Sequence, residues 1–166
     1  LISIDGMRPD GLKACGNPYV KELEKMCSYT YNGSSVNPSV TFPCHFSMTH
    51  SVTPQRHGIL SNTYVPQVHP VKGIFQKVCE VGGVCAMYYG WEPLRDIARP
   101  GSLKFASYIN AYTEESSDTS LTTLALNMNH GNEAARIYEV AAVFDAENRT
   151  EENLPTENQK LCLGVY

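Results

Sequence analysis

Apolar residues near the start of the chain follow two different spacings, which predict two different elements. The run Leu1–Ile4 is predicted as the second half of a buried strand, which ends at Asp5 and at a turn on Gly6. Residues 19–26 carry apolar side chains at helical spacing, and the preceding pair Asn17-Pro18 is typical of a helix start. The sequence therefore predicts a strand, a loop and a helix in this order.

The next stretch is rich in proline, hydroxyl groups and histidine. Residues 28–37 hold the turn pair Asn32-Gly33, which indicates a short hairpin or an extended segment. Further on, Thr41-Phe42-Pro43 predicts a helix that starts directly after extended backbone. We therefore expect the Thr41 hydroxyl at a helix N-terminus.

A helix, a glycine pair and a strand are predicted in succession in the middle of the chain. Helical spacing runs over residues 71–81, Gly82-Gly83 is typical of a helix end, and residues 84–89 have the character of a strand. This order is half of a strand–helix–strand crossover, so we expect an α/β fold with a parallel-rich sheet flanked by helices. A further helix is predicted at Leu121–Met128 and a further strand at Val140–Phe144.

Composition narrows the class of protein. The 166 residues are 42% apolar and 18% charged, with 13 basic and 17 acidic side chains. Such a chain can bury a core, but it has no basic cluster of the kind that binds a nucleic-acid polymer. It also has no apolar run long enough for a membrane span. The oligomeric state is not predicted.

The six cysteines are scattered singly, without a Cys-x-x-Cys pair. This pattern excludes a zinc ribbon or a thioredoxin-type motif, and in a chain of this size it favours reduced thiols over a secreted disulfide framework. We therefore expect a cytoplasmic protein. An extracellular location stays open, because the printed sequence begins without Met and a signal peptide upstream of Leu1 would not be seen.

Two side chains are candidates for chemistry from their positions alone. Asp5 stands where a strand is predicted to end, at the edge where open α/β sheets bind ligands, so its carboxylate could hold a divalent metal or cap a turn. Thr41 could attack phosphorus while nearby backbone N–H groups receive phosphate oxygens, or it could cap the helix. Position alone favours the two capping roles.

Three segments around these residues, followed by Asn62, carry a recognisable pattern: Ile4–Asp10, Asn37–His45 and Pro54–Ile59. In order, they read as a strand followed by D-G-x-R-x-D, then P-[ST]-x-T-x-P-x-H, then T-x-x-x-x-P-x-x-H-G-I. This set resembles the type I phosphodiesterase/nucleotide pyrophosphatase branch of the alkaline phosphatase superfamily. The likeness continues through Tyr89–Leu94 and covers roughly the first 125 residues.

The resemblance implies a hydrolase of phosphoric esters that uses two divalent metal ions, usually zinc. Asp5 and Thr41 would both ligate one metal, and Thr41 would be the nucleophile that forms a phosphothreonine intermediate. A threonine hydroxyl is a weak nucleophile at neutral pH, and coordination to a cation favours its alkoxide. The implied substrate is a small phosphorylated molecule, whose identity the sequence does not reveal.

Further residues of the same region are candidates for substrate contact. Cys44 stands three residues after the implied nucleophile, where many family members have an Asn that donates to the phosphoryl group. Asn62 is a second candidate. Trp91, the single tryptophan, could stack on a base at the rim of the sheet or pack in the core. Three histidines are expected to shape the loop rather than bind metal: His45, His50 and His57.

The chain divides into residues 1–128, the N-terminal part of a phosphodiesterase-like α/β domain, and residues 129–166, a tail that does not resemble the family. The family takes most of its metal ligands from a later part, and neither His130 nor Asp145 fits that pattern, so the site is incomplete at the C-terminal side of this chain. The predicted function is a metal-dependent phosphoric ester hydrolase acting through Thr41. The alternative is a catalytically inactive binding or scaffold protein that retains the fold.

Overall fold

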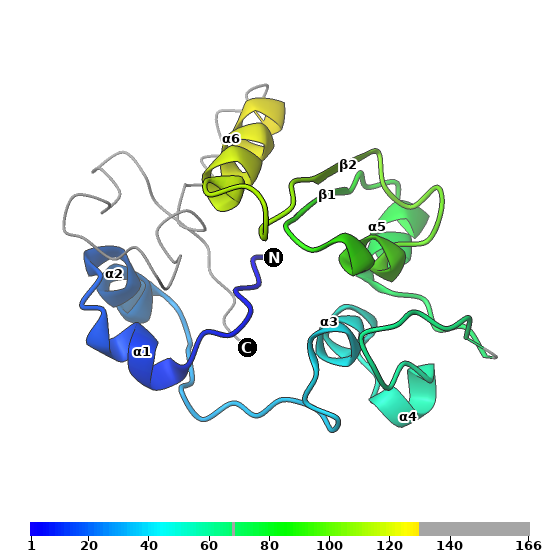
Figure 1. Cartoon of the computed structure of the whole chain (residues 1–166), viewed down its shortest axis with the longest axis horizontal. Helices are drawn as coiled ribbons and strands as arrows, with labels where there is room; N and C mark the ends of the chain where they lie inside the picture. The colour runs from blue at the N-terminus through cyan, green and yellow to red at the C-terminus, as the bar shows by residue number, and fades with distance from the viewer. Residues whose placement is uncertain (68, 130–166) are drawn as a thin grey trace. The chain divides into compact units, whose positions relative to one another are not determined.

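The chain is built from short helices and a small sheet. The computed structural model describes residues 1–67 and 69–129 (Figure 1). The described residues separate into two compact units, of which the first comprises residues 1–34 and 111–129 and the second lies within residues 35–110. Each unit has a hydrophobic core of its own.

In the first unit, α1 (Pro9–Ala14) is followed closely by α2 (Pro18–Met26). The Asn17 side chain caps α2, because its Oδ1 accepts hydrogen bonds from the backbone N–H groups of Tyr19 at 2.9 Å and Val20 at 3.3 Å. The proline at the first helical position loses no helical hydrogen bond there. The helix predicted after this cap is confirmed.

The opening residues pack on these helices without forming a strand. Leu12 and Val20 are buried, and the half-buried Ile2 and Ile4 pack against them. Alternate residues of the opening segment thus face the core, but no described residue pairs with it in a β-ladder. The strand predicted there is not found, because periodicity reports which side chains are buried and not whether a partner strand is present.

The first unit also contains α6 (Ser117–Asn129), which confirms the helix predicted at Leu121–Met128. Leu121 is buried. Across the part of the chain that the structure describes, no helix is long and apolar enough to cross a membrane. The strand predicted at Val140–Phe144 lies outside the described residues.

The second unit packs helical segments around an aromatic core. In it, α3 (Thr41–His50) contacts α4 (Pro54–His57), α5 (Ile74–Glu80) and the 3₁₀ helix η1 (Glu92–Ile97). The core consists of four buried residues: Phe42, Phe46, Ile59 and Ile97. Two of these four come from α3, which makes α3 the central element of the unit.

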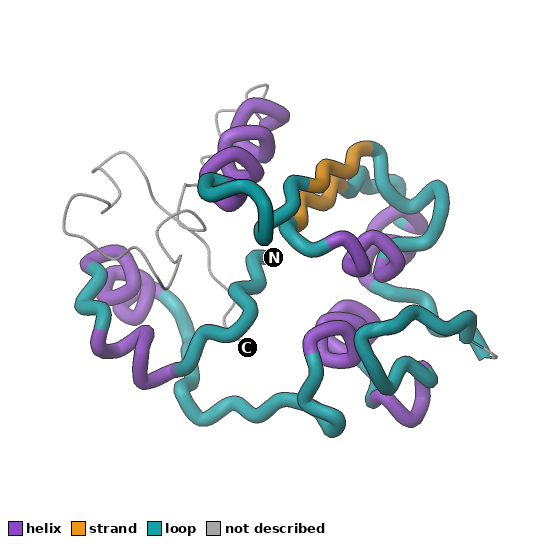
Figure 2. The backbone as a smooth tube through the Cα atoms, viewed as in Figure 1, coloured by secondary structure: helices purple, strands orange, loops and turns teal. Residues whose placement is uncertain are grey.

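Two parallel strands, β1 (Ala86–Tyr89) and β2 (Phe105–Tyr108), form the sheet of the described residues, drawn in orange in Figure 2. Since α5 precedes β1, the predicted order of helix, glycine pair and strand is confirmed. Between the two strands the chain forms η1. The chain therefore combines helices with a small parallel sheet.

Candidate functional site

Thr41 is the first residue of α3, as predicted. The backbone is extended at Val40, with φ −124° and ψ 147°, and becomes helical at Thr41. Pro43 fits in the first turn, because its missing N–H leaves no helical hydrogen bond unmade there. The half-buried Thr41 side chain therefore stands at the N-terminal end of a ten-residue helix, a position where negative charge is favoured.

Asn62 fixes this helix start from a distant part of the sequence. Its Oδ1 accepts a hydrogen bond from the backbone N–H of Phe42 at 2.9 Å. Val40 precedes the helix without a side-chain cap, so Asn62 supplies the acceptor that an N-cap residue usually provides. The sequence singles out Asn62 only as a substrate contact, because capping rules consider residues adjacent to the helix.

Trp91 packs beside the same helix start. Its ring meets the buried Phe42 ring edge to face, with centroids 6.4 Å apart and an interplanar angle of 79°. The tryptophan is half-buried and packs against the core of the second unit. The structure thus shows the core-packing role that the sequence leaves open, and contact between Trp91 and a substrate stays a prediction.

Cys44 lies in the first turn of α3. Its Sγ is 2.8 Å from the hydroxyl oxygen of Ser35 and 3.9 Å from the carbonyl oxygen of Pro38. Both partners precede the helix in the chain, so the thiol connects the first turn to the segment before it. Contact between Cys44 and a substrate stays a prediction as well.

His57 is buried and has a partner at each ring nitrogen. Its Nδ1 accepts a hydrogen bond from the backbone N–H of Ile59 at 3.0 Å, so Nε2 carries the proton and donates to Ser47 Oγ at 2.9 Å. Burial lowers the pKa of His57. These contacts give the ring a structural role, in which it joins α3 to the end of α4.

The other two histidines of this stretch also make local contacts. The His50 ring stacks on Phe46 with centroids 3.9 Å apart, and burial lowers the pKa of His50. A Cβ added at Gly73 would lie only 2.8 Å from His50 Nε2, so the ring fills the space at the start of α5. The Nδ1 atom of His45 lies 2.8 Å from the carbonyl oxygen of Thr41, one helical turn earlier.

Asp5 lies in the first unit, at the end of the opening segment. It is exposed and is followed by Gly6 with φ 72°, which confirms the predicted turn. Thr41 belongs to the second unit, so the metal that Asp5 and Thr41 are expected to share stays a prediction. Among the residues that the structure describes, no group of three or more His, Cys, Asp or Glu side chains is arranged to hold a metal ion.

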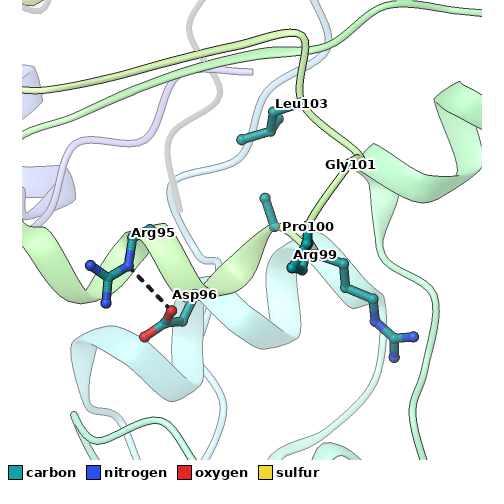
Figure 3. A pocket seen from close by; sticks show the side chains of 7 residues that line it. Arg95, Asp96, Arg99, Pro100, Gly101 and Leu103 are labelled. Carbon is teal, nitrogen blue, oxygen red and sulfur yellow. Dashed lines mark hydrogen bonds and ion pairs between the residues drawn. The ribbon is translucent and has the colours of Figure 1, made fainter.

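A shallow cavity of about 310 Å³ lies next to η1, between Arg95 and Leu103 (Figure 3). Arg95 pairs with Asp96 at 3.4 Å. The Arg99 guanidinium points away from Arg95 and donates to the carbonyl oxygen of Val71 at 3.2 Å. The two positive charges therefore do not converge on one anion, and the residues predicted for the site do not line this cavity.

The segments that carry Asp5 and the helix start at Thr41 define the class of protein. A family model described as type I phosphodiesterase / nucleotide pyrophosphatase matches residues 1–98, more than half of the chain. The chain therefore belongs to this family, as its motifs predict. The matched region also includes Cys44, Asn62 and Trp91.

Among curated proteins, the chain is similar to ectonucleotide pyrophosphatase/phosphodiesterase family member 1 from three mammals. The human protein is 38% identical over 72 residues, the rat protein 36% and the mouse protein 35% over the same length. Each match covers 42% of this chain but only 8% of the relative. The chain thus spans a small part of the length of these relatives.

A second family model, described as the phenylalanyl tRNA synthetase beta chain CLM domain, matches residues 115–166. This range is less than half of the chain and includes α6, while most of it lies outside the described residues. The boundary predicted between residues 128 and 129 falls inside this match. No solved structure matches the chain.

Proposed function

We propose that this chain contains the nucleophile segment of a metal-dependent hydrolase of phosphoric esters, with Thr41 as the nucleophile. The observation that carries the proposal is the position of Thr41 at the first residue of α3, inside the region that matches the phosphodiesterase family. The substrates would be small phosphodiesters or nucleotide pyrophosphates rather than a nucleic-acid polymer.

The start of α3 suits a phosphoryl group for a physical reason. Backbone N–H groups in the first turn of a helix point along its axis, and the helix dipole favours negative charge there. The hydrogen bond from Phe42 to Asn62 keeps this first turn in place. Asn62, Cys44 and Trp91 are proposed as substrate contacts around Thr41, because each lies in the first turn or against it.

The proposed reaction has two steps. In the first, Thr41 Oγ1 gives its proton to water and attacks phosphorus. The bond between phosphorus and the leaving oxygen breaks as the Oγ1–P bond forms, and the leaving oxygen takes up a proton from water. In the second, water attacks the phosphothreonine, breaks the Oγ1–P bond and restores the hydroxyl. The same residue is thereby ready for the next substrate.

Two divalent metal ions, with zinc as the expected element, are proposed as cofactors, and Asp5 and Thr41 as ligands of one of them. A zinc site in a protein takes about four ligands. The described residues do not fit a complete site by themselves, since they contain no group of three ligating His, Cys, Asp or Glu side chains. The proposal therefore gives Asp5 and Thr41 a part of the ligand set only.

We also propose that the parallel pair of strands belongs to a parallel-rich sheet flanked by helices, as in alkaline phosphatase-like proteins. The strands β1 and β2 pair in parallel, and α5 precedes β1, an order typical of α/β folds. Residues 1–128 would then form the N-terminal part of this domain and residues 129–166 a separate tail. In this chain the sheet would be incomplete at its C-terminal side.

The alternative is a catalytically inactive binding or scaffold protein that keeps the fold. The contacts of Trp91 with Phe42 and of Cys44 with Ser35 favour it, because both side chains serve packing in the structure. The two functions differ in one measurable property, since only the hydrolase turns over a phosphodiester.

Substitution of Thr41 in the natural full-length protein tests the proposal. Thr41→Ala should lower the hydrolysis of a chromogenic phosphodiester by about a thousandfold or more, because the attacking oxygen is lost. Thr41→Ser should retain a measurable fraction of the activity, since it keeps the oxygen. Thr53→Ala is the matched control, because Thr53 is exposed and its side chain caps no helix.

Each outcome bears on one of the two functions. Full activity of Thr41→Ala, with the fold intact by circular dichroism, would overturn the role of Thr41 as nucleophile. A wild-type protein that binds nucleoside monophosphates without turning over any phosphodiester would support the inactive binding protein instead.

A further inference from the structure

Two cysteines lie at either end of the connection between α5 and β1. Cys79 is in the last turn of α5, and Cys85 directly precedes β1. The chain between them contains Gly82-Gly83. Both cysteines are thiols in the structure, Cys79 exposed and Cys85 half-buried.

The glycine pair folds the chain back onto α5. Gly82 has φ 79°, a left-handed conformation that side chains disfavour. The N–H of Gly83 donates to the carbonyl oxygen of Val78 at 2.9 Å, and a Cβ on Gly83 would lie 2.5 Å from Val78 Cγ1. Only a glycine permits this close approach, which returns the chain to the last turn of the helix.

The returning chain brings the two sulfur atoms to the same side of α5. Cys85 Sγ lies 3.8 Å from the carbonyl oxygen of Phe75, the residue one helical turn before Cys79 and thus on the same face of the helix. Cys79 Sγ lies 3.3 Å from the carbonyl oxygen of Ser102. Two residues further on, the Lys104 N–H donates to the carbonyl oxygen of Cys85 at 2.8 Å, so both cysteines contact the same short segment.

The electrostatics of Cys85 agree with this proximity. Burial is the main cause that raises the pKa of its thiol, and the neighbouring Cys79 raises it further through its charge and a hydrogen bond. An exposed thiol next to a less exposed one is the arrangement in which one sulfur can react first and the other can complete a disulfide.

We propose that Cys79 and Cys85 form an intramolecular disulfide that fixes the end of α5 to the start of β1. The oxidant is a small disulfide such as glutathione disulfide. The Cys79 thiol loses its proton, and its sulfur attacks the oxidant and releases one glutathione thiolate. The Cys85 thiol then loses its proton, and its sulfur attacks Cys79 Sγ and releases the second. Formation of the new S–S bond removes two electrons from the cysteine pair, and these two electrons reduce the oxidant. The two thiolates released from the oxidant take up the two protons.

The 166-residue chain offers a clear test by peptide mapping. Trypsin cuts after Lys77 and Arg95, and the peptide between them contains Cys79 and Cys85 and no other cysteine. After equilibration with glutathione disulfide and alkylation of the remaining thiols, this peptide should carry no alkyl group and should weigh two hydrogens less than its reduced form. After prior reduction it should carry two alkyl groups.

A second digestion identifies the bond itself. A protease that cuts after Glu80 separates Cys79 from Cys85, so the two pieces should stay joined until a reducing agent is added. Cys79→Ser and Cys85→Ser should each abolish the joined species. Cys15→Ser is the control and should leave the joined species unchanged, because the Cys15 thiol belongs to the other unit, where it donates to the Leu12 carbonyl. Two alkylated thiols, a glutathione adduct on Cys79 alone, or a bond to another cysteine would each overturn the proposal.

Discussion

Asn62 has one role that the structure shows, the hydrogen bond with Phe42, and one that is proposed, contact with the substrate. Its Oδ1 accepts a hydrogen bond from the backbone N–H of Phe42, the residue that follows the proposed nucleophile in the first turn of α3. Capping needs only the acceptor oxygen, whereas contact with a phosphoryl oxygen needs a donor or at least the absence of negative charge. Substitutions at Asn62 can therefore separate stability from substrate binding.

We expect Asn62→Ala to lower the free energy of unfolding by about 1 kcal/mol, because the Phe42 N–H loses its acceptor. Asn62→Asp should keep the stability, since a carboxylate accepts the same bond and suits the helix dipole, but it should weaken the binding of inorganic phosphate or a nucleoside monophosphate. Urea unfolding and calorimetric titration measure the two effects. Undiminished phosphate binding by Asn62→Asp would show that Asn62 serves the helix start alone.

Among single residues, the position of Thr41 was predictable from its neighbours in the sequence, whereas the contacts of Trp91 and Asn62 depend on long-range packing. Extended backbone followed by Thr41-Phe42-Pro43 is a pattern within a few residues, and the structure confirms the helix start there. The contact of Trp91 with Phe42 and the cap from Asn62 join positions far apart in the chain. No local pattern encodes such contacts, because they depend on how the second unit folds.

The same distinction holds for the elements. The helix α2 was predictable because Asn17 provides its cap within the sequence, and α5 because Gly82-Gly83 ends it. The strand β2 was not, since its four residues become a strand only by pairing with β1. The opening segment shows the reverse case, in which strand-like alternation is present but no described residue offers a partner.

The packing of α3 on α4 should depend on pH through His50 and His57. Burial is the main cause that lowers the pKa of both, and His50 also faces His57 and Arg99, which lower its pKa further. Their contribution to stability is therefore complete above the ordinary histidine pKa of about 6.5. As the pH falls from there through the lowered pKa values of the folded state, the unfolded chain binds more protons and the contribution is lost.

We expect urea midpoints to decrease between about pH 7 and about pH 5, with each histidine contributing about 1.4 kcal/mol per unit by which its pKa is lowered. Replacing His57 and His50 by Gln should flatten this profile. His69→Gln, at an exposed histidine, should leave it unchanged. A wild-type profile that is flat over this range would contradict the burial of two neutral histidines.

At the scale of the whole molecule, two family models match separate parts of the chain. The phosphodiesterase model covers residues 1–98, and the synthetase domain model covers residues 115–166. The second unit, residues 35–110, holds Thr41, Asn62 and the two cysteines of the proposed disulfide.

The expected cytoplasmic location stays a prediction. The redox state of Cys79 and Cys85 in protein from the natural source would test it, since disulfides persist in oxidising compartments.

The metal content of the 166-residue chain is the last prediction. We expect substoichiometric zinc, because Asp5 and Thr41 provide too few ligands to compete with water. We also expect little or no turnover of a phosphodiester, because the described residues hold no complete set of ligands for a second cation that would stabilise the leaving oxygen. Elemental analysis of the purified chain and a phosphodiester assay measure both. Two tightly bound zinc ions with robust turnover would contradict the expectation and direct attention to His130 and Asp145, which lie outside the described residues.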